Sequence, residues 1–161
     1  MTKPNSHAQG WCTIWYMNFS EHISASADRG QCWAAVADVT TWPQWTKSMR
    51  SVEPLDSASL AVGNRYRVTQ PGMPKLVWQV DELTEGQEFT WSSRSPGVRT
   101  VAYHRLSPNA DGTTEISIGV AHSGPLAGLV AALTRKRTER YLKMEAAGLK
   151  AASETSLATD E

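Results

Sequence analysis

The feature that most constrains the fold is a series of short segments in which apolar and polar side chains alternate. The alternation is present in residues 65–70, 75–83, 89–93, 98–106 and 114–122. Such alternation is typical of strands with one buried face. Turn sequences rich in Gly, Pro, Asn and Asp separate the segments, so each strand leads directly into the next as a hairpin. Consecutive hairpins predict an antiparallel sheet.

Further elements flank this series. Residues 13–23 are rich in β-branched and aromatic side chains and predict a strand, and residues 29–37 and 42–49 predict two short helices. From Pro125 to about residue 152 the sequence predicts one long helix. At about 100° per residue, Arg137 falls within its apolar stripe, and Arg140 and Tyr141 fall at the edges. The apolar residues of this predicted stripe are Leu126, Val130, Leu133, Met144, Gly148 and Ala151.

A sheet with one apolar face must cover that face. A helix of about 28 residues spans about 42 Å, which is long enough to lie across a curved sheet. We therefore expect an α+β fold: a curved antiparallel sheet of about seven strands wrapped around a long C-terminal helix, with two short helices between the first two strands. We expect one domain over residues 13–152, a flexible leader over residues 1–12 and a polar tail over residues 153–161. Such a sheet and helix tend to enclose a cavity.

Composition excludes several classes of function. The 161 residues carry 16 Lys and Arg against 16 Asp and Glu, without the basic excess that a nucleic-acid-binding surface needs. No apolar run approaches the ~20 residues of a membrane-spanning helix, and the start of the chain lacks the apolar stretch of a signal peptide. We therefore expect a cytoplasmic protein without stable membrane insertion, either a monomer or a weak homodimer.

The cysteines and the known motifs exclude further chemistry. Cys12 and Cys32 are too few for a disulfide scaffold or a zinc site, and we expect both to be reduced and unlinked. The sequence contains no phosphate-binding loop, zinc-protease motif or nucleophile elbow, so we expect no metal and no organic cofactor. Seven Trp against two Phe is unusual, because rings with a polar handle suit the wall of a pocket better than a small core.

Several motifs resemble the START/Bet v 1-like (SRPBCC) superfamily, in particular its polyketide cyclase/dehydrase-like branch. The matching segments, in order along the chain, are Ile23–Ala27, Cys32-Trp33, Asp38–Trp45, Val62–Tyr66, Trp78–Val80, Phe89–Trp91, Tyr103–Leu106, Gly112–Thr114 and Ser123–Pro125. The resemblance covers about residues 13–152. It implies a helix-grip fold with a deep, mostly apolar cavity. It does not decide the chemistry, because similar proteins include lipid carriers, hormone receptors, aromatic cyclases and co-chaperone-like proteins.

Arg137 and His104 are the candidate polar groups of this cavity. A guanidinium at Arg137 can bind a carboxylate, phenolate or enolate; alternatively it pairs with Glu21 or extends to the cavity mouth. His104 is predicted to face inward beside the small residues Thr100 and Ala102, where an imidazole can act as an acid or a base. Alternatively, a strand hydroxyl or a water molecule satisfies it.

Aromatic and aliphatic side chains are expected to form the rest of the cavity wall, although each of them can equally be plain core. If the protein is an enzyme, the catalytic candidates are His104, Arg137 and Tyr66. The predicted ligand-binding residues are Glu21, Tyr66, Val68, Trp78, Trp91, Ala102, His104, Ile116, Ile118, Leu133, Arg137 and Tyr141.

Two functions remain in competition, with a third behind them. The first is binding or carriage of a small hydrophobic molecule, aromatic and acidic ones included, by desolvation in the cavity. The second is a cyclase or dehydratase that folds a reactive polyketone and moves its protons. A protein-interaction module would require an exposed apolar patch.

Overall fold

The computed structural model of the protein describes residues 16–155. The predicted leader over residues 1–12, with Cys12, lies outside the described residues, as do the first three residues of the predicted first strand and the end of the predicted tail.

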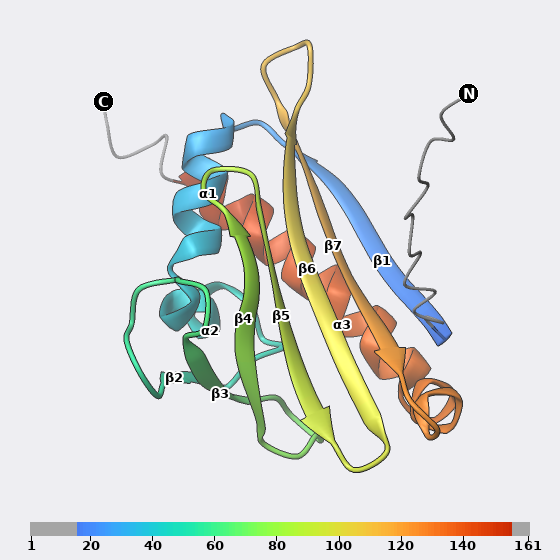
Figure 1. The fold of residues 1–161 in the computed structure, drawn as a ribbon. Helices are drawn as coiled ribbons and strands as arrows, with labels where there is room; N and C mark the ends of the chain where they lie inside the picture. Colours follow the sequence, from blue (N-terminus) through green and yellow to red (C-terminus); the bar gives the residue numbers. More distant parts are fainter. Residues whose placement is uncertain (1–15, 156–161) are drawn as a thin grey trace, which may run out of the picture.

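A single antiparallel sheet of seven strands forms the body of the fold (Figure 1). Its spatial order is β1-β7-β6-β5-β4-β3-β2, so the strands from β2 to β7 pair consecutively and β1 pairs with β7. The strands are β1 (Tyr16–Ala25), β2 (Ser51–Pro54), β3 (Arg65–Thr69), β4 (Leu76–Thr84), β5 (Glu88–Ser95), β6 (Val98–Pro108) and β7 (Thr114–Ser123). The predicted seven-stranded antiparallel sheet is confirmed.

Two short helices follow β1, as predicted. The first, α1 (Arg29–Ala37), begins at Asp28, whose carboxylate accepts a hydrogen bond from the backbone N–H of Gln31 at 2.9 Å. A 3-10 turn, η1 (Val39–Thr41), leads into α2 (Trp42–Trp45). The prediction that this second helix reaches residue 49 is wrong. Thr46 is extended (φ −127°, ψ 128°), and its buried hydroxyl lies 2.8 Å from that of Ser48, which favours the extended backbone.

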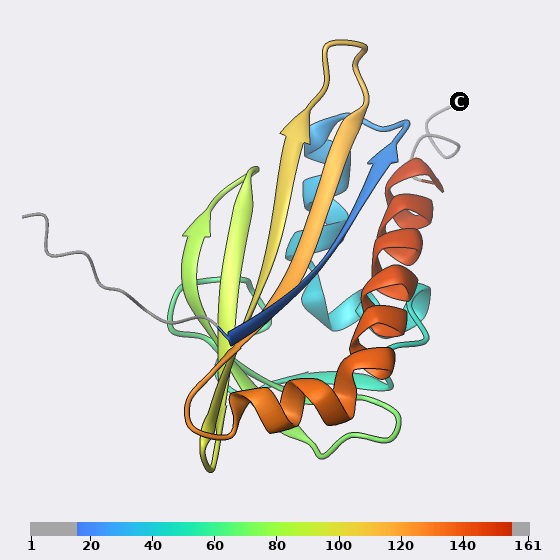
Figure 2. The same ribbon diagram turned by 90° about the vertical axis from the view of Figure 1, so that its right-hand side faces the viewer.

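The long helix α3 (Ala127–Thr155) covers the concave face of the sheet, beside α1 (Figure 2). Its first part runs at a steep angle to the rest. Within it, the hydroxyl of Thr134 donates to the carbonyl oxygen of Val130 at 2.7 Å, a contact that often accompanies a bend in a helix.

The predicted rotation of α3 about its axis is wrong. Leu133 was expected to face the sheet, yet it is 78% exposed. The inward stripe carries small and polar residues such as Ala131 and Glu145 among its larger apolar ones, whereas Leu133 lies outside it. A stripe chosen by hydrophobicity alone is therefore displaced by about one residue. The buried residues of α3 are Ala127, Ala131, Tyr141, Leu142, Glu145, Ala146, Leu149 and Ser153.

Trp42 lies at the centre of the core and has no exposed surface. Its indole N–H donates to the carbonyl oxygen of Val36 at 3.1 Å, which satisfies the polar end of the ring. Its ring centroid lies 5.3 Å from that of Trp91, 6.2 Å from that of Phe89 and 4.8 Å from that of His104. The short helix α2 therefore supplies the ring that joins α1 to β5 and β6.

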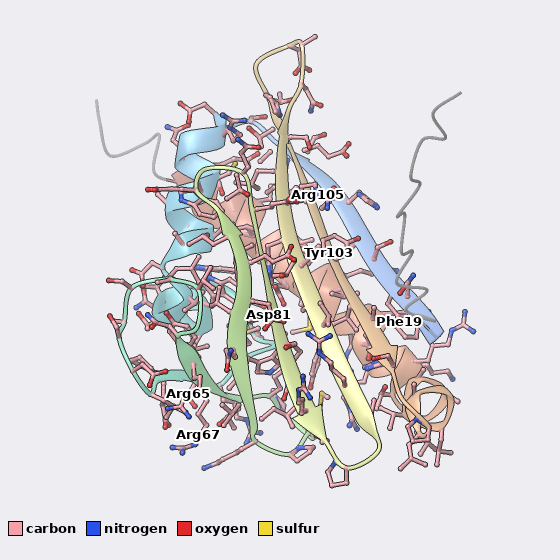
Figure 3. The ribbon with its side chains drawn as sticks, in the orientation of Figure 1. Phe19, Arg65, Arg67, Asp81, Tyr103 and Arg105 are labelled. Carbon is pink, nitrogen blue, oxygen red and sulfur yellow. The ribbon has the colours of Figure 1, made fainter. Side chains whose placement is uncertain are left out.

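The face of the sheet opposite α3 is polar. Figure 3 views this face and shows Arg65 and Arg67 on β3, Asp81 on β4, and Tyr103 and Arg105 on β6. Arg65 and Arg67 alternate with buried neighbours on β3. The alternation that predicted the strands thus separates a solvent-exposed face of the sheet from the face that packs against α3.

Two glycines of α3 provide a matched test of how closely the helices pack. A side chain at Gly148 would overlap the carbonyl oxygen of Trp45, whereas a side chain at Gly128 would contact nothing. We expect Gly148→Ala to destabilise the protein by about 1–3 kcal/mol, since backbone cannot yield as a side chain can. We expect Gly128→Ala to be neutral or to stabilise by up to about 1 kcal/mol through helix propensity. Urea unfolding measures both, and equal effects would contradict the close approach of α2 and α3.

Candidate functional site

A cavity lies between the concave face of the sheet and α3, as predicted. Its larger part, here called the outer chamber, has a volume of about 300 Å³. It is bounded by the loop after β3, the β5–β6 turn, strands β4, β6 and β7, and α3. The lining residues are Met73, Pro74, Leu76, Trp78, Ser95, Pro96, Val98, Thr100, Val120, His122, Val130, Thr134, Thr138, Tyr141, Leu142 and Glu145.

A smaller inner chamber of about 50 Å³ adjoins the outer chamber deeper in the fold. Trp78, Val120, Leu142 and Glu145 line both chambers, so the two are continuous along the same wall. The inner chamber is lined by Met49, Val68, Trp78, Trp91, Ala102, His104, Ile118, Gly119, Val120, Leu142 and Glu145.

The most buried polar contact of this wall joins His104 on β6 to Glu145 on α3. The Nε2 atom of His104 lies 2.6 Å from Oε1 of Glu145, and the two side chains are 4% and 8% exposed. Phe89 stacks on the imidazole at 4.7 Å with 10° between the ring planes, and Trp42 lies against it at 4.8 Å. The rings exclude water and fix the imidazole, so the carboxylate of Glu145 is its polar partner in the fold.

The chemistry of this pair follows from its position. Glu145 lines both chambers, whereas His104 lines only the inner one. A carboxylate on the wall of an apolar cavity, with an imidazole behind it, can accept a hydrogen bond from a ligand or exchange a proton with it. Nδ1 of His104 is buried without a hydrogen-bond partner among the described residues, so Nε2 makes the polar contact of this imidazole.

A second histidine, His122 on β7, lies opposite Thr100 on β6. The Nδ1 atom of His122 is 2.9 Å from Oγ1 of Thr100, and both residues line the outer chamber. The side chain of His122 is buried, although this residue lies near the end of β7. Burial lowers the pKa of His122 below its ordinary value of 6.5, because the charged form loses its hydration. A neutral imidazole therefore borders the cavity near pH 7.

The lowered pKa of His122 predicts an acid-dependent loss of stability. Below about pH 6.5 the unfolded chain binds a proton that the buried imidazole resists, so protonation favours unfolding. The stability present above that pH is lost as the pH falls through the lowered pKa of the folded state. We expect His122→Phe to weaken this dependence between about pH 7 and pH 5. Urea unfolding at each pH measures it, and parallel curves for the two proteins would contradict the assignment.

Arg137 and Tyr141 fasten the loop after β3 to α3. The guanidinium Nη1 of Arg137 donates to the carbonyl oxygen of Gly72 at 2.6 Å, and the hydroxyl of Tyr141 donates to that of Pro71 at 2.5 Å. The next residue, Met73, lines the outer chamber. Arg137 is exposed and is absent from both chambers. The prediction that its guanidinium enters the cavity rests on the wrong rotation of α3.

Four other predicted residues lie elsewhere. Glu21 borders a surface groove between β1 and α3, and Arg137 is not among the residues that line it. Tyr66 is buried outside both chambers, where its hydroxyl donates to the carbonyl oxygen of Ser59 at 2.7 Å. Burial raises the pKa of that hydroxyl, which opposes a role in moving protons. Ile116 belongs to the core, and Leu133 is exposed.

The remaining predicted residues do meet at the cavity. Tyr141 lines the outer chamber and Trp78 lines both chambers. The others line the inner chamber: Val68, Trp91, Ala102, His104 and Ile118. Sequence reasoning missed Glu145. The available signal was its spacing of three and four residues from Leu142 and Leu149 on one face of a helix.

The described residues contain no cluster that could hold a metal ion and no helix that could cross a membrane. Among residues 16–155, no three His, Cys, Asp or Glu side chains lie close enough together to hold a metal ion. Cys32, on α1, is a buried free cysteine, and burial raises the pKa of its thiol. No helix in this part of the chain is both long enough and apolar enough to cross a membrane.

Comparison with known proteins identifies the family. The family described as polyketide cyclase / dehydrase and lipid transport matches residues 17–154. The chain belongs to this family. The resemblance predicted from its motifs is therefore confirmed. A comparison of this family member's sequence with curated proteins gives no match.

Solved structures share the fold of this family member. A hypothetical protein of Helicobacter pylori has a TM-score of 0.76 at 16% identity, covering 95% of this chain and 99% of its own. A protein of Nitrosospira multiformis has a TM-score of 0.67 at 17% identity over 88% and 99% of the two chains. The protein XoxI of Bacillus cereus has a TM-score of 0.65 at 10% identity over 91% and 99%. At these identities the likeness concerns the fold alone.

Proposed function

We propose that the protein binds and carries a small hydrophobic molecule in the cavity between the sheet and α3. The observation that supports this most directly is the outer chamber of about 300 Å³. Its size lies at the lower end of the range for ligand pockets, and a mostly apolar wall with a few polar groups is the usual composition of such sites. His122, Thr100 and Glu145 are the polar groups that would orient the ligand.

The charges of the wall favour a neutral ligand over an acidic one. No Lys or Arg side chain is among the residues that line either chamber, whereas Glu145 lines both. An anionic ligand would lie beside a carboxylate with no cation to offset the loss of its hydration. A neutral aromatic molecule with a hydrogen-bond donor would instead stack on Trp78 and donate to Glu145 or to His122.

A matched pair of probes tests this proposal. N-Phenyl-1-naphthylamine is neutral, and 8-anilino-1-naphthalenesulfonate is the same molecule with an added sulfonate. We expect calorimetric titration to give one saturable site for the neutral probe, with the negative heat-capacity change of apolar burial, and weaker binding of the sulfonate. Absence of saturable binding by either probe would contradict the carrier function. Tighter binding of the sulfonate would contradict the neutral ligand.

The contact between His104 and Glu145 favours a second candidate function, an enzyme of the cyclase or dehydratase type. In that function Glu145 takes a proton from a substrate carbon or returns one to an oxygen, while His104 holds the carboxylate in place. A general probe of such a base is 5-nitrobenzisoxazole. Loss of its ring C–H proton breaks the N–O bond and releases a coloured phenolate.

The two candidate functions differ in their response to this probe. For the enzyme we expect saturable turnover that Glu145→Gln abolishes and that a surface variant, Arg94→Gln, leaves unchanged. A rate no greater than that of the buffer, in a protein that still binds the neutral naphthylamine probe, would favour the carrier and contradict proton abstraction by Glu145.

A further inference from the structure

A stripe of exposed leucines runs from the residue before α3 into the first two turns of that helix. Leu126, Leu129 and Leu133 are 45%, 58% and 78% exposed. Their spacing of three and four residues places them on one face of the helix. The other large hydrophobic residues exposed in the described part of the chain lie elsewhere: Val62 lies between β2 and β3, and Val77 lies on β4. The leucines therefore form a contiguous apolar stripe.

Basic residues follow the leucines along α3. Lys136 and Arg137 lie within about one turn of Leu133, and Arg140 lies about one turn further on; all three are exposed. Within residues 16–155 none of them forms an ion pair. Arg137 donates to a neutral carbonyl oxygen, and the guanidinium of Arg140 lies over the Tyr141 ring at 5.5 Å. This face therefore carries positive charge, although the net charge of the whole chain is zero.

The leucine stripe lies at the rim of the outer chamber. The backbone N–H of Leu126 donates to the carbonyl oxygen of Gly97 at 2.9 Å, and its side chain lies against that glycine. The residues on either side of Gly97, Pro96 and Val98, line the outer chamber, as does Val130 of the same helix. A surface pressed against the leucines would thus lie beside the outer chamber.

We propose that this face of α3, Leu126, Leu129 and Leu133 with Lys136, Arg137 and Arg140, docks on the anionic surface of a lipid bilayer. Leucines that enter the headgroup region and basic residues that contact anionic lipids are the two parts of an interfacial helix. A second copy of the chain fits this face less well, because a two-fold contact would bring its cations together. Docking places the cavity beside the bilayer, from which a hydrophobic ligand can enter.

Co-sedimentation with lipid vesicles tests the proposal on the full-length chain. We expect binding to vesicles of phosphatidylcholine with phosphatidylserine, weaker binding to phosphatidylcholine alone, and a decrease with added salt. Leu129→Ser/Leu133→Ser should lower the partition coefficient at least about tenfold, and Lys136→Gln/Arg140→Gln should do the same. Val62→Ser/Val77→Ser and Arg67→Gln/Arg94→Gln are matched controls elsewhere on the surface and should bind as the unchanged protein does.

The opposite results would overturn the proposal. One such result is that the protein does not bind to anionic vesicles. Another is that the control variants lose as much vesicle binding as the leucine and basic variants do. A dimer measured by light scattering that Leu129→Ser/Leu133→Ser dissolves would assign the face to a second copy instead. These results are separate from those that test the carrier function, because the naphthylamine probe is titrated without lipid.

Discussion

Glu145→Ala is expected to lower the free energy of unfolding by about 3–5 kcal/mol, the usual cost of removing one partner of a buried pair. His104 would keep its place between Phe89 and Trp42, but its Nε2 atom would lose the carboxylate oxygen that lies 2.6 Å away. Nδ1 of His104 already has no hydrogen-bond partner among the described residues, so both ring nitrogens would then lack a protein partner, and an unpaired buried polar group is costly.

A double-mutant cycle distinguishes the interaction energy of His104 with Glu145 from the cost of lost side-chain volume. His104→Phe combined with Glu145→Leu replaces both polar groups with apolar ones of similar size, which is often close to neutral. We expect the double variant to be destabilised by at least about 1 kcal/mol less than the sum of the destabilisations of the two single variants. Chemical unfolding measures all four proteins. Additive effects would show that the two side chains do not interact.

Thr138→Trp is expected to weaken binding of the neutral naphthylamine probe at least about tenfold. Thr138 lines the outer chamber from α3 and is half-buried, so an indole at this position would occupy space that the ligand needs. Because Thr138 borders the outer chamber of about 300 Å³, we expect the fold to accommodate the ring, at a cost of no more than about 1–3 kcal/mol.

The matched control for this variant is Val77→Trp. Val77 lies on β4, is 42% exposed and does not line either chamber. The Val77→Trp variant therefore carries the same added ring outside the cavity. The affinity of this variant for the probe should equal that of the unchanged protein. Equal weakening by both variants, or none by Thr138→Trp, would mean that the probe binds elsewhere.

The sheet could be predicted from sequence because its two faces differ so strongly. On β3, exposed Arg65 and Arg67 alternate with buried Tyr66 and Val68, and that alternation has only one interpretation. Glycines in the turns confirm it: Gly97 has a φ of 77°, a conformation that most residues avoid. The length and place of the long helix followed from the same reasoning.

The rotation of α3 could not be predicted, and this explains the errors at the site. Leu133 and Arg137 were placed inward because leucines usually seek the core, whereas this helix turns Ala131 and Glu145 inward. Glu145 lies where this inward face borders the cavity, beside Leu142 and Leu149 on the same face. The spacing of Glu145 from Leu142 and Leu149 was the signal for its inward position, but a glutamate on a helix ordinarily faces water, and that expectation outweighs the spacing.

Native mass spectrometry of the protein purified from its own host tests the central claim, that the cavity holds a ligand, most directly. We predict one small organic molecule bound to each chain, released on unfolding and missing from the Thr138→Trp variant purified in the same way. A protein that carries the mass of the bare chain alone, or a bound molecule retained by the Thr138→Trp variant, would contradict the claim.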